Sequence, residues 1–362
     1  MATYSRRGFL NRVGAGAALF ALPSLTAPAS LKKEKKVGVA LVGLGYYSEH
    51  KLAPALREAS NCYLAGVVSG TPSKISQWKK QYDLPDRSCY SYEDFDRISE
   101  NKDIDVVYVV LPNAMHHEYV IRAAKAGKHV ICEKPMAVSV QEAEEMIAAC
   151  KEANVKLSIG YRLHFEPFTQ AAMRVGQKKE FGAVKIVESS MGFRMGDPNQ
   201  WRLKKSLAGG GAMMDVGIYA IQGARYSTGE EPIAITAQEF KTDPVKFKEV
   251  DETVLWQMEF ASGAVANCMT TYASSVERLF ISAEQGWLEL RPAFGYGPLK
   301  GSTHQGELKL PHTNHQLLQL EDFARCVLED RESSVAGEEG LRDMKVIAAI
   351  YQSIATGKRV TL

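Results

Sequence analysis

The sequence predicts an α/β fold in two parts, a doubly wound parallel sheet followed by an α+β part with an open, mainly antiparallel sheet. Three patterns predict it. Up to about residue 160, continuous apolar runs alternate with amphipathic helices, and the first of these runs ends in glycines. Beyond residue 160, strand-like runs follow one another across turn residues. We therefore expect one domain at residues 37–160 and a second at 161–362.

Residues 37–160 carry the alternation of strand and helix. Each expected strand is a continuous apolar run, as in parallel sheets whose two faces are both covered by helices. The expected strands are 37–45, 63–70, 105–112 and 129–135, and the helices between them include 52–59 and 116–127. This order is typical of doubly wound domains.

The second part contains strand-like runs at 184–193, 233–240, 254–260, 263–273 and 278–290. Turn signals such as Ala261-Ser262-Gly263 favour antiparallel hairpins between them. A helix is expected at 209–229, with Gly229 as its C-cap, and an amphipathic helix at 338–358 ends the chain. That last helix is free to pack back on the first domain.

The first 36 residues read as an export signal and a short connecting segment. The apolar run 13–22 is too short to cross the roughly 30 Å core of a bilayer. Ala27-Pro28-Ala29 supplies a small-x-small cleavage site, so we expect residues 1–29 to be removed and 30–36 to remain. Residues 5–10, SRRGFL, resemble the twin-arginine signal, whose route exports folded proteins to the periplasm. An ordinary secretory signal is the alternative.

Composition excludes several function classes. With 44 basic and 42 acidic residues, nothing calls for nucleic acid or an acidic membrane surface, and no later segment is apolar enough to span a membrane. The six cysteines form no C-x-x-C pair, which argues against zinc and against a disulfide framework. His116 and His117 are adjacent but lack an obvious carboxylate partner, so no metal is expected.

A glycine turn follows the first strand. In Gly43-Leu44-Gly45-Tyr46-Tyr47-Ser48, the first glycine permits the tight turn and the second lets the backbone approach a pyrophosphate at the start of the next helix. Serine stands where the third glycine is usual. This context, strand then turn then helix, predicts a dinucleotide-binding Rossmann domain.

The end of the second strand indicates which dinucleotide. Enzymes that use NAD place a carboxylate there for the ribose 2′-hydroxyl, whereas this strand ends in Ser69-Gly70-Thr71 with Lys74 one turn later. Two hydroxyls and an ammonium suit a 2′-phosphate, so NADP is favoured. The alternative is an ordinary turn whose serine or threonine caps the next helix.

A family resemblance begins with the motif Glu133-Lys134-Pro135, which follows a predicted strand about 90 residues beyond the glycine turn. The mature chain resembles the Gfo/Idh/MocA oxidoreductases throughout, in LPNAMHHEY, AGKHVICEKPMA, IGYRLHFEP, WRLKKSLAGGGAMMDVGIYAIQGARY and GYGPL. Many members carry Asp-x-Gly-x-His where this chain has Asp215-Val216-Gly217-Ile218-Tyr219. The tyrosine, the strand end and the signal resemble the glucose-fructose oxidoreductase branch, whose members hold NADP tightly in the periplasm and convert sugars.

The resemblance implies site residues. It makes Lys134 and Tyr219 the catalytic pair and places Trp201, Arg202 and Tyr296 near the cofactor. With the glycine turn and the strand ends, the expected cofactor-binding set is Gly43, Leu44, Gly45, Tyr46, Tyr47, Ser69, Gly70, Thr71, Lys74, Leu111, Pro112, Asn113, His116, Glu133, Lys134, Arg162, Trp201, Arg202 and Tyr296. For Arg162, a contact with substrate or cofactor and a structural ion pair both remain open.

The expected reaction oxidises an aldose at C1 and reduces a second sugar at the same site. Tyr219 would take the hydroxyl proton, with the Lys134 ammonium stabilising its phenolate. Asp215, one helical turn before Tyr219, is assigned to a sugar hydroxyl. A periplasmic enzyme has no pool of NADP, so the cofactor would be loaded before export and recycled in place by ping-pong kinetics.

Two other functions fit the same sequence. One is a glycosidase of this fold that oxidises the sugar transiently, although such an enzyme would carry histidine at Tyr219. The other is a non-catalytic sugar-binding protein with a bound dinucleotide. The resemblance also implies self-association, as a dimer or tetramer, through the open sheet. The type member of the glucose-fructose oxidoreductase branch has a long N-terminal arm that wraps a neighbouring subunit, whereas residues 30–36 here are only SLKKEKK. This difference argues against a tetramer held by such an arm and leaves a dimer through the open sheet.

Overall fold

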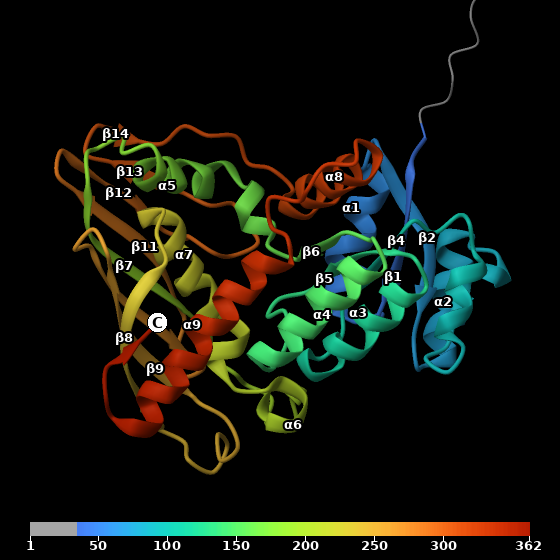
Figure 1. Cartoon of the computed structure of the whole chain (residues 1–362), viewed down its shortest axis with the longest axis horizontal. Helices are drawn as coiled ribbons and strands as arrows, with labels where there is room; N and C mark the ends of the chain where they lie inside the picture. Colours follow the sequence, from blue (N-terminus) through green and yellow to red (C-terminus); the bar gives the residue numbers. More distant parts are fainter. Residues whose placement is uncertain (1–34) are drawn as a thin grey trace, which may run out of the picture. The chain divides into compact units, whose positions relative to one another are not determined.

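The computed structural model describes residues 35–362, which form one unit with two sheets (Figure 1). The predicted signal, residues 1–29, and most of the predicted segment 30–36 lie outside the described residues. Within residues 35–362, no helix combines the length and apolar character needed to cross a membrane.

The first sheet has six parallel strands in the order β3-β2-β1-β4-β5-β6, as in doubly wound dinucleotide-binding domains. β1 and β4 are buried along their whole length, which explains their continuous apolar sequences. The strands are β1 Val37–Val42, β2 Cys62–Val68, β3 Cys89–Tyr90, β4 Val106–Val109, β5 His129–Cys132 and β6 Leu157–Ile159. The predicted parallel α/β domain is confirmed.

Two helical layers cover this sheet. Val37, Val39 and Leu41 of β1 belong to one core and Ala40 and Val42 to the other, since successive side chains of a strand point to opposite faces. One layer contains α3 and α4, and the other contains α1 and a late helix, α8 (Figure 1). The helices of this half are α1 Ala53–Glu58, α2 Pro72–Tyr82, α3 His116–Lys125, α4 Val140–Glu152 and α8 His315–Leu328.

Helix α8 comes from the C-terminal half but completes the first domain. Its Leu320 and Phe323 are buried in the same core as Leu41 and Leu52, and it contacts α1, β1 and β2. The sequence patterns predicted no helix at this place. The inner face of α8 therefore lies directly beneath the strands whose ends build the site.

The second sheet has nine strands in the order β14-β13-β12-β11-β7-β10-β9-β8-β15. All pairs are antiparallel except β7 with β10, so the predicted mainly antiparallel sheet is confirmed. The run 278–290, expected as one strand, is the hairpin β11–β12. The strands are β7 Val184–Gly192, β8 Pro232–Phe240, β9 Thr253–Phe260, β10 Val265–Thr271, β11 Val276–Ala283, β12 Gly286–Leu290, β13 Gly301–Thr303, β14 Gly306–Glu307 and β15 Val360–Thr361.

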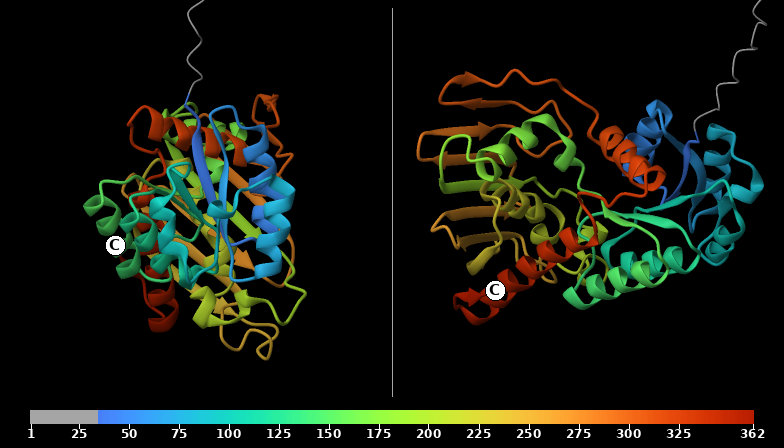
Figure 2. Two further views of the ribbon diagram at one scale, coloured as in Figure 1. Left: turned by 90° about the vertical axis from the view of Figure 1, so that its right-hand side faces the viewer. Right: turned by 45° about the horizontal axis from the view of Figure 1, so that its top comes forward.

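Helices α5 Pro167–Gln177, α7 Ile218–Thr228 and α9 Gly337–Thr356 lie on one face of this sheet (Figure 2). α7 ends at the predicted C-cap, Gly229, in the left-handed conformation. α5 was not predicted, and α9 contacts both β8 and α4 of the first domain. Apolar side chains such as Ile186, Leu255 and Val265 are exposed on the sheet. Self-association through this sheet stays a prediction.

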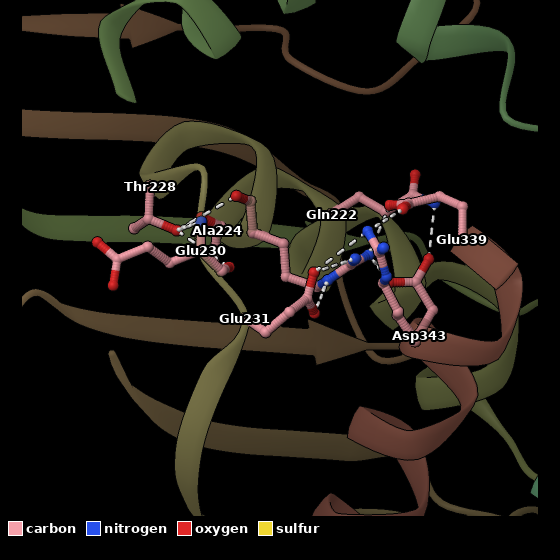
Figure 3. Close-up of polar contacts among 9 residues, drawn as sticks. Gln222, Ala224, Thr228, Glu230, Glu231, Glu339 and Asp343 are labelled. Atoms are coloured by element: carbon pink, nitrogen blue, oxygen red, sulfur yellow. Dashed lines mark hydrogen bonds and ion pairs between the residues drawn. The ribbon is translucent and has the colours of Figure 1, made fainter. Parts of the chain in front are cut away.

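A buried ion-pair cluster joins α7 to α9 (Figure 3). The guanidinium of Arg225, which is 3% exposed, contacts Asp343 at 2.5 Å, Glu231 at 2.7 Å and Glu339 at 2.9 Å. Gln222 donates to the second Asp343 oxygen at 2.8 Å. Burial raises the pKa of Asp343 to about 6, although Arg225 opposes the rise. Arg225 thus contacts three carboxylates, and the more exposed Arg342 also lies 3.1 Å from Glu339 and 3.8 Å from Glu231.

Candidate active site

A cavity of about 1080 Å³ lies between the carboxyl ends of the first sheet's strands and segments of the second half. The loops after β1, β2, β4 and β5 form one wall, and residues 200–202, 215–219 and 294–296 form the other. The cavity is large enough for a dinucleotide and a small substrate, since typical ligand pockets measure about 300 to 1,000 Å³. Every residue of the predicted site lines it except His116.

The glycine turn has the shape that a dinucleotide requires. Gly43 has φ +95°, and a Cβ there would lie 2.2 Å from the carbonyl oxygen of Val110. A Cβ on Gly45 would meet nothing within 4 Å, so the backbone there faces open space in the cavity. The buried Ser48 hydroxyl donates to the Gly43 carbonyl at 2.6 Å and ties the turn to the following helix. These residues fit a pyrophosphate held against backbone N–H groups.

The loop after β2 offers hydroxyls and an ammonium. Lys74 donates to the carbonyl of Leu44 at 3.0 Å, which holds its ammonium beside the glycine turn. Thr71 precedes α2 but its side chain caps no helical N–H, contrary to what the ordinary-turn alternative requires. Ser69 is buried and accepts from the Thr71 N–H at 3.2 Å.

No carboxylate among the described residues lines this end of the cavity. The two carboxylates that line the cavity, Glu133 and Asp215, lie away from the loop after β2. Glu133 follows β5, which is three positions along the sheet from β2. The loop after β2 therefore has the donors for a phosphate and lacks the acid that a free ribose 2′-hydroxyl would use.

The predicted catalytic pair comes together in the cavity. Lys134 follows β5, and Tyr219 lies in the first turn of α7. The Lys134 ammonium is 4.8 Å from the centre of the Tyr219 ring and donates to the backbone carbonyl of Asp215 at 2.5 Å. Lysine and tyrosine, far apart in the sequence, thus meet in one cavity, each from one of its two walls.

Asp215 is a fixed, ionised carboxylate beside this pair. Its Oδ2 accepts from the Tyr272 hydroxyl at 2.9 Å and pairs with Arg202 Nε at 3.0 Å, and Lys134 lies 3.5 Å from Oδ1. Burial opposes its ionisation, but Arg202 and Lys134 outweigh burial and hold the pKa of Asp215 below its usual value. Its sugar-hydroxyl role stays a prediction, and Tyr272, at the end of β10, was not predicted at all.

Arg162 is buried and lines the cavity without an ion pair among the described residues. Its guanidinium donates to the carbonyls of Phe294 at 2.6 Å and Gly295 at 2.9 Å and contacts His315 Nδ1 at 2.9 Å. It also lies over the rings of Tyr296 at 4.6 Å and Tyr219 at 5.4 Å. The structural ion pair that the sequence left open is therefore not present within residues 35–362, and Arg162 anchors the 294–296 loop.

The second half closes over the glycine turn through two aromatic contacts. Tyr296 lies 6.1 Å from the ring of Tyr47, and the Lys51 ammonium is 4.7 Å from the Tyr296 ring. Arg202 stacks on Trp201 at 4.5 Å while holding Asp215. Both predicted segments thus line the same cavity as the glycine turn, and their contact with the cofactor stays a prediction.

The histidines depart from their predicted roles. His116 does not line the cavity, because its ring is buried between the carbonyls of Leu111 and Pro135, each at 2.9 Å. Its ring hydrogen-bonds the backbone of two cavity loops and does not itself line the cavity. His117 does have a carboxylate partner, Glu145 at 2.7 Å, which the sequence did not indicate. Within residues 35–362, no group of three or more potential metal ligands is found.

Sequence reasoning missed part of the cavity wall. Met191 and Phe193 at the end of β7, Gln200, Val216 and Phe294 all line the cavity, as do Tyr92, Val110 and Gly295. Most are apolar or common residues in ordinary strands and loops. Only Val216 and Gly295 stand inside motifs that the family resemblance singled out, and Phe294 precedes one of them.

Three family models match the chain. Residues 37–161 match the GFO_IDH_MocA oxidoreductase family with its NAD-binding Rossmann fold, 169–289 match a GFO/IDH/MocA C-terminal domain, and 298–362 match the oxidoreductase family's C-terminal alpha/beta domain. The NADP(+) D-xylose 1-dehydrogenase of Haloarcula marismortui is 28% identical over 340 residues, covering 91% of this chain and 94% of the relative. A second NADP(+) D-xylose 1-dehydrogenase, from Haloferax volcanii, is 30% identical, and the match covers 88% of this chain and 97% of the relative.

Solved structures agree. The crystal structure of aldose-aldose oxidoreductase from Caulobacter crescentus, complexed with glycerol, is 43% identical with a TM-score of 0.88, over 91% of this chain and 100% of that chain. Levoglucosan dehydrogenase, at 23% identity and a TM-score of 0.77, shares the fold. This chain therefore belongs to the Gfo/Idh/MocA oxidoreductase family.

Proposed function

We propose that this protein is a periplasmic sugar oxidoreductase that keeps NADP bound, oxidises an aldose at C1 and reduces a second sugar at the same site. The observation that carries the proposal is the position of Lys134 and Tyr219 in one cavity with the glycine turn, 4.8 Å separating the ammonium from the ring. The similarity to an aldose-aldose oxidoreductase and to NADP(+)-dependent xylose dehydrogenases supports it. The twin-arginine pattern at residues 5–10 supports export.

The bound dinucleotide supplies the acceptor and donor of hydride. Tyr219 takes the proton of the sugar hydroxyl as the carbon loses hydride, so that a carbonyl forms. The Lys134 ammonium stabilises the phenolate, and Asp215, fixed by Arg202 and Tyr272, accepts from a second sugar hydroxyl. With the second sugar the steps reverse, and the Tyr219 phenol returns its proton to the carbonyl oxygen.

The purified protein is expected to carry NADP rather than NAD. Ser69, Thr71 and Lys74 offer partners to a 2′-phosphate, and no carboxylate of the described cavity wall at that end repels it. Denaturing the protein and identifying the released nucleotide by chromatography and mass spectrometry measures this directly. Release of NAD would overturn the assignment of the loop after β2.

Turnover is expected to need no added nucleotide and to follow ping-pong kinetics. The oxidised donor must leave before an acceptor enters the same cavity, while Tyr296, Lys51 and Arg202 cover the dinucleotide. Initial rates over a grid of donor and acceptor concentrations, in nucleotide-free buffer, should give parallel double-reciprocal lines. Intersecting lines would mean that both sugars bind together and would contradict the ping-pong order. An absolute need for added NADP would contradict the retained cofactor.

The same preparation separates the two rival functions. An aldose panel should change the absorbance of the bound nicotinamide, and a non-catalytic binding protein would leave it constant with every sugar. Liberation of free sugar from aryl glycosides, with no net reduction of an acceptor, would identify a glycosidase instead.

A further inference from the structure

We propose that Glu133 is the counter-charge of the oxidised nicotinamide, and that Tyr108 and the α8 residue Gln319 hold it ionised in that role. The consequence is a lower reduction potential for the bound cofactor than the cavity would otherwise impose. This inference rests on the proposed function, because it requires a bound NADP that is reduced and reoxidised in place.

Glu133 has a fixed place in the cavity wall next to Lys134. Its Oε1 accepts from the Tyr108 hydroxyl at 2.6 Å, and its Oε2 accepts from the Lys134 N–H at 3.3 Å. A Cβ on Gly160 would lie 2.6 Å from Oε1 and 3.2 Å from the Glu133 Cα, so glycine at this position lets the carboxylate lie close to the backbone. The carboxylate is therefore held by two donors and packed against Gly160.

Further support for this carboxylate comes from the late helix α8. Gln319, 1% exposed, donates its amide to the Tyr108 oxygen at 2.7 Å, which leaves the Tyr108 proton directed at Glu133. Two neighbours on α8 reach other cavity groups: His315 contacts Arg162 at 2.9 Å and Gln316 donates to the Tyr47 hydroxyl at 3.4 Å. Buried polar side chains on one helix face are uncommon unless they have partners, and here every partner lines the cavity or contacts a group that does.

The charges of the cavity wall explain what an ionised Glu133 would do. Lys134, Arg162 and Arg202 are cations of the cavity wall, and Asp215 is already paired with two of them. An oxidised nicotinamide ring adds a further positive charge, whereas the reduced ring is neutral. Glu133 therefore favours the oxidised ring and leaves the reduced ring almost unaffected.

Hydrogen bonding and nearby cations favour the charged form of Glu133. Burial raises the pKa of Glu133 above its usual value, and the Tyr108 hydroxyl, Lys134 and Arg162 limit that rise. Because a retained cofactor must accept hydride from one sugar and deliver it to another, its potential sets the balance between the two half-reactions. Lowering that potential makes the reduced cofactor a stronger donor to the acceptor sugar.

The test is Glu133→Gln in the full-length holoenzyme, compared with Glu144→Gln on the exposed surface of α4 as a control of equal charge change. Glutamine has the same size, and its carbonyl can still accept from Tyr108. The midpoint potential of the bound nucleotide, titrated against redox dyes by its absorbance, should rise by about 30 mV, which corresponds to tenfold weaker binding of the oxidised form for a two-electron couple. Dissociation constants for NADP⁺ and NADPH should show that loss in the oxidised form alone.

A second variant distinguishes charge from folding. Tyr108→Phe keeps Glu133 but removes the hydroxyl that donates to it, so the pKa of Glu133 should rise further. The ratio of the dissociation constants for NADP⁺ and NADPH should then change with pH, and this change should occur closer to neutral pH than in the wild type. Equal weakening of both forms in Glu133→Gln, or an unchanged ratio in both variants, overturns the inference while leaving the proposed function intact. A wild-type protein that binds neither nucleotide overturns the proposed function itself.

Discussion

Replacing Tyr219 by phenylalanine is expected to slow both half-reactions by about 10² to 10⁴, the usual contribution of a general acid or base. The ring would keep its packing against Phe294, 6.2 Å away, and its contact with the Lys134 ammonium. Only the hydroxyl that moves the proton is lost. Single-turnover reduction of the bound cofactor by an aldose, followed by absorbance, measures this step without product release.

The nucleotide content of the Tyr219→Phe protein is the control, and it should equal that of the wild type. Tyr272→Phe is a useful comparison, because Tyr272 touches Asp215 rather than the Lys134–Tyr219 pair and should cost less. Near wild-type rates in Tyr219→Phe would move the proton transfer to another group, with Lys134 the first to test.

Replacing Arg225 by leucine is expected to lower the free energy of unfolding by about 3 to 5 kcal/mol, the usual effect of removing one partner from a buried ion pair. Asp343 is fully buried and loses the cation with which it pairs, whereas the nearly buried Glu339 keeps only its contact with the exposed Arg342. Urea unfolding of the full chain measures the change. Arg342→Leu is the matched control: Arg342 pairs with Glu339 from an exposed position, so its loss should cost at most about 1 kcal/mol.

The destabilisation by Arg225→Leu should depend on pH in a defined direction. The pKa of Asp343, about 6 in the folded protein, already lies above its ordinary value of 3.8, and loss of Arg225 raises it further. A carboxyl whose pKa is raised by folding destabilises the folded state once the pH exceeds its unfolded value. The variant should therefore regain stability as the pH falls from about 8 to about 5, and equal losses at both pH values would contradict this account.

Local sequence patterns were sufficient for the first sheet but not for the order of the second. Strands such as Val106–Val109 have continuous apolar sequences because both of their faces are buried. The β7–β10 pair is parallel, although β10 carries the same alternating burial pattern as its antiparallel neighbour β9. Pairing direction depends on the chain's route between strands, here through α7, β8 and β9, and no single strand encodes it.

The site also contains residues that the sequence identified and residues that only the tertiary fold revealed. Gly43, Lys134 and Tyr219 stand in motifs whose spacing and family resemblance identify them from the amino-acid sequence alone. Tyr272 and Gln319 lie in an ordinary strand end and an ordinary amphipathic helix, so their contacts with Asp215 and Tyr108 arise only from the tertiary fold. His116 shows the opposite case, because its place in the LPNAMHHEY motif suggested a ligand contact where the ring supports the backbone.

The dependence of the first domain on α8 has a consequence for how the protein is made. A ribosome adds about 5 to 20 residues per second, so the stretch from residue 160 to the end of α8 at Leu328 takes roughly ten to thirty seconds to synthesise. Throughout that interval the nascent dinucleotide-binding half lacks Leu320 and Phe323 over one face of its sheet, and Gln319 beneath Tyr108. The complete nucleotide site therefore forms late in synthesis, after most of the polypeptide has left the ribosome.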